Sequence, residues 1–78
     1  MSKNRIARIK NIISEVLEID EEMISGEFSP NQVGNWDSMR HMKIIISLEE
    51  EYGIMFDADE IPKMLSFDKI CETIEAKL

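Results

Sequence analysis

The sequence predicts an all-α fold, a four-helix bundle with a long loop between its first and second helices and a short third helix. Apolar residues recur at intervals of three and four along three stretches, as they do on one face of a helix. Glycine, proline, asparagine and serine separate these stretches, and no stretch shows the alternation typical of a strand. A chain of 78 residues is expected to form a single domain, residues 1–78.

The first helix is predicted over residues 3–18, where isoleucine, valine and leucine recur at helical spacing. Residues 19–35 lack this period and are rich in glycine and asparagine, which indicates a long connection. A connection of this length in a compact domain usually has a function or covers part of the core. Ile24, Phe28 and Val33 are expected to tether it to the core.

The second helix is predicted from Met39 to Tyr52, with Asp37 as its N-cap and Gly53 as its stop. One or two further helical turns are expected around Pro62, which would interrupt a longer helix. The last helix is expected to begin after Ser66, a candidate cap, and to carry an apolar face to the end of the sequence. Such a bundle is expected to leave no deep pocket of its own.

The composition bears on compartment and partners. Nine basic against sixteen acidic residues give a net charge of -7, which opposes binding to nucleic acid or to an anionic membrane. The single cysteine, Cys71, has no partner for an internal disulfide or a zinc site, which favours a reducing compartment. It lies on the apolar stripe of the last helix, so a buried structural thiol is expected. No signal-like or membrane-spanning stretch follows Met1, so the chain is expected to be cytoplasmic, without stable membrane insertion.

Ser38 stands where the long loop gives way to the second helix. A helix start carries partial positive charge and N–H groups without intrahelical acceptors, so an anionic group bound there is stabilised. Two readings of this serine follow from position alone. It can be an attachment point for such a group, or it can be a helix-capping residue.

Residues 36–39, Trp-Asp-Ser-Met, resemble the Asp-Ser-Leu motif of acyl carrier proteins. The resemblance continues through the second helix to residues 48–54, Leu-Glu-Glu-Glu-Tyr-Gly-Ile. It also takes in residues 16–20, the loop, and residues 66–70 at the start of the last helix. The similarity therefore covers nearly the whole chain, with an acyl-carrier type of bundle as the implied fold.

The resemblance implies that Ser38 receives 4'-phosphopantetheine from coenzyme A, with Asp37 as its motif neighbour. Acyl or aminoacyl groups would be carried as thioesters on this arm. The implied partners are a phosphopantetheinyl transferase, an acyl- or aminoacyl-loading enzyme, and synthase or acyltransferase enzymes. On this reading the chain is a monomeric carrier, without catalytic residues or a metal site.

Other candidate sites are weaker. His41 could be imagined as a base for Ser38, but the sequence fixes no carboxylate to orient it, so packing or partner contact is favoured. The Asp57-Ala58-Asp59 segment starts like a calcium loop but has Pro62 where glycine is required. Trp36 is expected to pack against the core. A minimal enzyme is improbable because acid, base and nucleophile do not converge.

The chain departs from fatty-acid carriers in the turn after Ser38, where Arg40 and Lys43 replace acidic residues. Like charges across an interface exclude partners, so this departure predicts different enzymes and a specialised pathway such as a secondary metabolite, an unusual lipid or a glycan. The residues expected to contact partners are Met39, Arg40, Met42, Lys43 and Glu50. The Glu49-Glu50-Glu51 run is expected to face solvent and basic partner surfaces.

The alternative hypothesis is a small helical interaction domain. In that case the apolar residues around Met39 and Met42 would bind a partner helix, and Ser38 would serve only as a helix cap.

Overall fold

The computed structural model describes residues 3–78, except for the side chain of Gln32. Three α-helices form the body of the domain: α1 (Lys3–Leu17), α2 (Ser38–Tyr52) and α3 (Phe67–Lys77). Three 3-10 turns lie between them: η1 (Glu21–Met23), η2 (Pro30–Gln32) and η3 (Ile61–Lys63). There is no strand within residues 3–78, so the predicted all-α fold with a long loop between the first two helices is confirmed.

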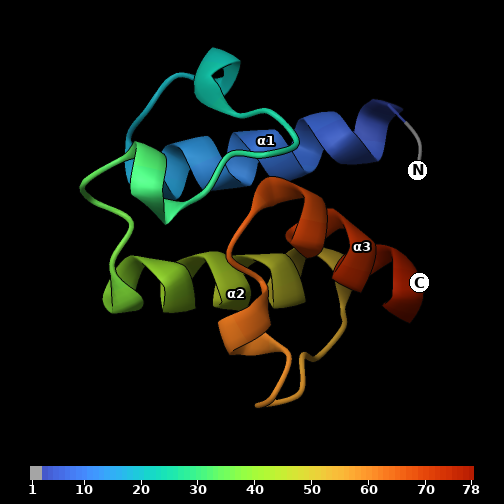
Figure 1. The fold of residues 1–78 in the computed structure, drawn as a ribbon. Coiled ribbons are helices and arrows are strands. Elements are labelled where there is room, and N and C mark those ends of the chain that lie inside the picture. Colours follow the sequence, from blue (N-terminus) through green and yellow to red (C-terminus); the bar gives the residue numbers. More distant parts are fainter. Residues whose placement is uncertain (1–2) are drawn as a thin grey trace.

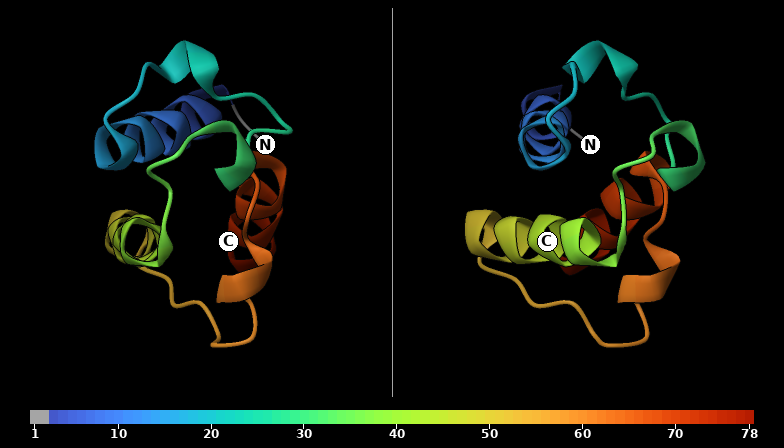
Figure 2. Two further views of the ribbon diagram at one scale, coloured as in Figure 1. Left: turned by 60° about the vertical axis from the view of Figure 1, so that its left-hand side comes forward. Right: turned by 90° about the vertical axis from the view of Figure 1, so that its left-hand side faces the viewer.

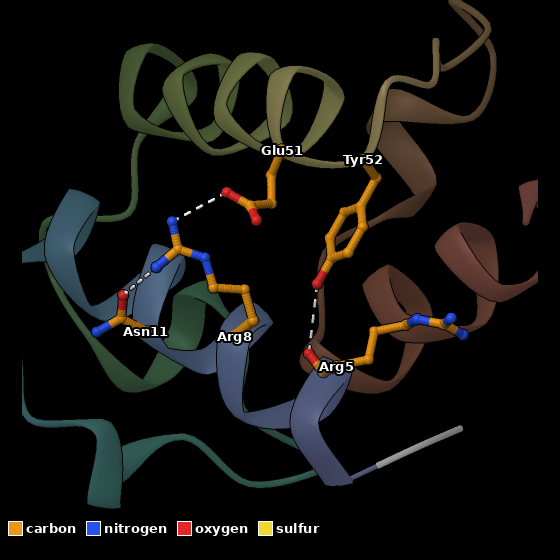
Figure 3. Close-up of polar contacts among 5 residues, drawn as sticks. All are labelled: Arg5, Arg8, Asn11, Glu51 and Tyr52. Atoms are coloured by element: carbon orange, nitrogen blue, oxygen red, sulfur yellow. Dashed lines mark hydrogen bonds and ion pairs between the residues drawn. The ribbon is translucent and has the colours of Figure 1, made fainter.

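Helices α1 and α2 lie side by side and run in opposite directions (Figure 1). At one end, the Tyr52 hydroxyl lies 3.5 Å from the Arg5 carbonyl oxygen, and the Arg8 guanidinium pairs with Glu51 at 2.9 Å (Figure 3). At the other end, the Arg40 guanidinium donates to the Val16 carbonyl oxygen. The first turn of α2 is thereby held at the C-terminus of α1.

The long loop reaches α3 before it returns to α2 (Figures 1 and 2). The N–H of Phe67 donates to the Phe28 carbonyl at 2.9 Å, and the N–H of Asp68 donates to the Gly26 carbonyl at 3.0 Å. These are first-turn N–H groups of α3 that have no acceptor within their own helix. The loop is therefore bonded to the start of α3, and Ser66 caps the same turn as predicted, by accepting from the Lys69 N–H.

The core is aliphatic and lies where the three helices and the loop meet. Its buried members are Ile9, Ile12, Ile13 and Leu17 of α1, Ile44, Ile45 and Leu48 of α2, Phe67, Ile70 and Ile74 of α3, and Ile24, Phe28, Trp36, Phe56 and Met64 of the connections. Ile24 and Phe28 are thus core residues, and Val33 is partly buried and packs against the core. The predicted tethers of the loop are confirmed.

The short third helix is only a 3-10 turn. Residues 57–60 form a hydrogen-bonded turn, and η3 follows with Pro62 in its first positions. Proline is tolerated in the first turn of a helix, but it has no backbone N–H to donate within a longer helix. The element therefore stays one turn long, and the bundle has three α-helices with η3 in the place of a fourth.

Helices α1 and α2 both end in a left-handed residue. Gly53 has φ 63° and donates its N–H to the Glu49 carbonyl, as predicted for the stop of the second helix. At the end of α1 the same conformation falls on Glu18, with φ 57°, and the N–H of Ile19 returns to the Ser14 carbonyl at 3.1 Å. Glycine adopts this conformation without the steric cost that a side chain brings.

We expect Glu18→Gly to raise the free energy of unfolding by about 0.5–1 kcal/mol, because it removes that steric cost. The matched substitution Gly53→Ala should lower it by about 1 kcal/mol. The Glu18 pair with Arg40 is long, 3.8 Å, and the Glu18 side chain is 78% exposed, so its loss should matter little. Urea unfolding of the three proteins tests this; a destabilised Glu18→Gly variant would show that the strain is absent.

Candidate functional site

Ser38 is the first residue of α2, and it is exposed. Asp37 precedes it in an extended conformation and is the N-cap: its carboxylate accepts the Arg40 N–H at 2.9 Å, and its carbonyl accepts the His41 N–H at 2.9 Å. The N–H groups of Ser38 and Met39 come before the first intrahelical bond and remain available to an anion. Asp37 is thus the cap, as predicted, and the reading of Ser38 as the capping residue is wrong.

The segment around Ser38 is fixed to the C-terminus of α1 by two side chains. Asn35 donates its amide N–H to the Leu17 carbonyl oxygen, and Arg40 donates to that of Val16. Both carbonyls belong to the last turn of α1, where no intrahelical donor exists. The sequence reasoning missed these bonds, because neither side chain belongs to a recognisable capping pattern. Arg40, expected to face partners, directs its guanidinium to α1.

On the other side, Trp36 and His41 are buried, with exposed fractions of 6% and 7%. The Trp36 ring stacks on Phe28 at a centroid distance of 5.6 Å, which confirms its predicted packing role. Its indole N–H donates to His41 Nδ1 at 3.1 Å, and His41 Nε2 lies 2.8 Å from the Ile61 carbonyl oxygen. Both ring nitrogens are therefore occupied within the fold, and His41 has none left for Ser38.

Ser38 is one of the residues that line an open groove of about 650 Å³. It is lined mainly by apolar side chains from the loop, α2 and the η3 region: Pro30, Trp36, Asp37, Ser38, His41, Met42, Ala58, Ile61, Pro62 and Leu65. Because the groove is open rather than enclosed, it does not contradict the expectation that the bundle leaves no deep pocket, but the sequence did not predict it. The groove depends on residues before α2 and around η3, which show no helical period, so a periodicity argument could not find it.

The residues expected to contact partners differ in what the fold leaves accessible. The side chains of Met39 and Met42 are 71% and 42% exposed. Lys43, the residue after Met42, is exposed too. Glu50 is exposed as well. Within the acidic run, Glu49 accepts the Phe56 N–H at 2.9 Å, and Glu51 pairs with Arg8. Glu50 and Glu51 are exposed, as expected of a solvated face, whereas Glu49 is only partly exposed, and the contacts of Glu49 and Glu51 with other parts of the domain were not foreseen.

The Asp57-Ala58-Asp59 segment leads into a local hydrogen-bond arrangement. Glu60 accepts the Asp57 N–H at 2.7 Å and pairs with Lys77 at 2.8 Å. The hydrogen bond from Lys77 lowers the pKa of the Glu60 carboxyl, and the same bond raises the pKa of Lys77. Across residues 3–78, no three acidic, histidine or cysteine side chains come together as a set of metal ligands.

Cys71 is half-buried on α3, beside Ile6 and Phe67. Burial, together with the nearby Asp68 carboxylate, raises the pKa of its thiol to about 11. A thiol is nucleophilic as its thiolate, so this cysteine is unreactive near neutral pH. The expectation of a structural thiol agrees with this, although the side chain is only partly buried.

The family described as "Phosphopantetheine attachment site" matches residues 7–75 of the chain. The chain belongs to this family. Among its relatives is an acyl carrier protein of Buchnera aphidicola, which is 35% identical over 75 residues and covers 96% of this chain and 94% of the relative.

Two further relatives show the breadth of the family. The acyl carrier protein of Thermosynechococcus vestitus is 27% identical over 73 residues, covering 94% of this chain and 90% of the relative. The polyketide-8 synthase acyl carrier protein 1 of Streptomyces avermitilis is 27% identical over 66 residues, covering 85% and 79%. The chain is thus an acyl carrier family member, and its prosthetic group is a covalently attached phosphopantetheine.

The site fits such a group. An exposed hydroxyl, two available N–H groups and an open apolar groove meet at the start of α2.

Among residues 3–78, no helix combines the length and the apolar character that a membrane crossing requires.

We expect Cys71 to react with iodoacetamide at pH 8 about 100-fold more slowly in the folded chain than in the urea-unfolded chain. Raising a thiol pKa from 9.0 to about 11 lowers the thiolate fraction at that pH by about two orders of magnitude. Intact-mass time courses measure both rates. Equal rates would show that the thiol is not protected by the fold.

Proposed function

We propose that residues 1–78 act as a carrier domain that bears 4'-phosphopantetheine on Ser38 and delivers acyl or aminoacyl groups to partner enzymes. The observation that carries this proposal is the exposure of Ser38 in the family's motif position, at the start of α2 and in the lining of the groove. The neighbouring residues Asn35, Trp36, Arg40 and His41 all bond to other parts of the domain. Ser38 is thereby presented on a fixed support.

The attachment step is a phosphoryl-type transfer with coenzyme A as the donor. A bond forms between Ser38 Oγ and the phosphorus of the phosphopantetheine half, and the pyrophosphate linkage of coenzyme A breaks. Adenosine 3',5'-bisphosphate leaves, and the hydroxyl proton passes to a base of the transferase. The phosphodiester then lies near the N–H groups of Ser38 and Met39 and the positive end of the helix dipole.

The chain's own contribution is binding and presentation. His41 is the single histidine of the chain and lies three residues after Ser38 on the helix, and both of its ring nitrogens are bonded elsewhere. His41 is therefore not available as a general base at the hydroxyl, and in the proposed function catalysis falls to the partners. The attached arm supplies a thiol on which cargo is held as a thioester.

Incubation with coenzyme A and a broad-specificity phosphopantetheinyl transferase should add one phosphopantetheine to the wild-type chain, as seen by intact mass. Ser38→Ala should gain none, because no other serine stands at the start of α2. Ser47→Ala, a half-buried serine within the same helix, is the matched control and should be modified like wild type. Lack of modification with several active transferases would refute the proposal.

We further infer that the partners recognise the exposed face of α2. Met39 and Met42 supply apolar contact area, and Lys43 supplies an exposed positive charge beside them. Because Arg40 is bonded to α1, Lys43 is the more accessible of the two basic residues in this turn. A partner with acidic groups opposite Lys43 fits this face better than the basic partners of fatty-acid carriers, which supports a specialised pathway. We propose the cytoplasm as its compartment.

We expect Lys43→Glu to raise the kcat/KM of loading by a housekeeping fatty-acid malonyl transferase about 10-fold, mainly through KM, because it removes a like-charge contact. Lys3→Glu carries the same charge change at the far end of α1 and is the control (Figure 1). Steady-state loading of the three holo proteins measures the effect. Efficient loading of the wild type, or an equal gain from Lys3→Glu, would argue against the proposed partner class.

The runner-up function is a helical interaction domain, which the exposed Met39, Met42 and Ile46 side chains on α2 favour. Ser38 would then have no chemical role. The Ser38→Ala variant separates the two functions, since an interaction domain would keep its partner binding without the hydroxyl.

A further inference from the structure

His41 makes two hydrogen bonds inside the domain, one at each ring nitrogen. Packing alone would not need a polar side chain at this position. The indole N–H of Trp36 can only donate, and the carbonyl oxygen of Ile61 can only accept. The imidazole between them must therefore be neutral, with its proton on Nε2, to satisfy both. An apolar side chain of the same size would fill the volume but satisfy neither partner.

The two hydrogen bonds join three separate segments. Trp36 closes the long loop two residues before Ser38, His41 lies in the first turn and a half of α2, and Ile61 opens η3. The bond between His41 Nε2 and the Ile61 carbonyl oxygen links α2 directly to η3. The position of η3 relative to Ser38 therefore depends on this bond together with apolar contacts.

The same three residues line the groove together with Ser38. Trp36 and His41 are nearly buried, and Trp36 stacks on the fully buried Phe28 beneath it. They form the base of the groove, with the core on their other side. A change in how Trp36 and His41 are arranged therefore alters both the shape of the groove and the orientation of the first turn of α2.

We propose that His41 is the positioning residue of the carrier site: through Trp36 and Ile61 it fixes the first turn of α2 and the groove base so that Ser38 meets the transferase in one geometry. This inference rests on the proposed function of Ser38. His41 touches neither coenzyme A nor the hydroxyl; it acts through the segments on either side. Small displacements of a reacting group from its productive geometry lower rates strongly, so positioning has a kinetic signature.

Steady-state transfer from coenzyme A to the wild-type and variant proteins provides the test. His41→Leu, which fills the site without hydrogen bonding, should lower kcat/KM for loading about 10-fold while circular dichroism shows a folded protein. His41→Gln, whose amide can still donate to the Ile61 carbonyl, should recover most of the rate. Trp36→Phe keeps the ring but removes the donor, and adding it to His41→Leu should cost little more, because both break one arrangement.

Nuclear magnetic resonance provides a second test that does not depend on the loading rate. Trp36 is the single tryptophan, so its indole N–H gives one proton resonance, which should shift in His41→Leu as its hydrogen bond is lost. The amide of Arg40, bonded to Asp37 in the same turn, should exchange faster with solvent. If His41→Leu does not fold, His41→Gln and Trp36→Phe decide by the same measurements.

The outcomes separate this inference from the function on which it rests. A folded His41→Leu that is loaded within twofold of the wild-type rate would overturn the positioning role and leave the carrier function intact. If the wild-type chain is not loaded at all, the carrier function fails, and unchanged Arg40 exchange in His41→Leu would then overturn the positioning role too.

Discussion

The fold around Ser38 depends on how the first turn of α2 is bonded to its neighbours. Asn35 and Arg40 donate to the last carbonyls of α1, and the Trp36–His41–Ile61 bonds reach to η3 on the other side. These bonds satisfy polar groups that a helix end, a loop and a short turn would otherwise leave unpaired. The same bonds set where the helix begins and which of its residues stay accessible.

This arrangement divides a short stretch of sequence into two roles. Residues 35, 36, 40 and 41 face the domain, while Asp37, Ser38 and Met39 face solvent. A carrier needs an attachment point that is accessible and held in a fixed position. The solvent-facing residues provide the access, and the residues that face the domain fix the position. It also divides the two basic residues near Ser38, since the guanidinium of Arg40 bonds to the C-terminus of α1 and Lys43, in the next turn of α2, carries the exposed positive charge.

Much of the fold followed from the sequence because the helices are amphipathic and their ends carry recognisable residues. Asp37, Gly53 and Ser66 each mark a boundary by local physics, and each was found where the structure has it. The η3 segment was harder, since Pro62 limits helix growth without specifying the turn that replaces it.

The site was predicted less completely, for a physical reason. Ser38 and Asp37 are identified by neighbouring residues, whereas Asn35, Arg40 and His41 act on partners that are 18, 24 and 20 residues away. Such contacts depend on tertiary packing and leave no periodic signal. The groove could not be predicted from the sequence for the same reason, because its lining comes from the loop, α2 and the η3 region together.

The most direct test of this account is to locate the modification on the loaded chain. Trypsin should release residues 11–40 as one peptide, which contains Ser14, Ser25, Ser29 and Ser38. Fragment-ion mass spectrometry of that peptide from the holo protein should place phosphopantetheine on Ser38. Attachment to any of the other three serines would contradict the view that the bonded first turn of α2 is what presents the site.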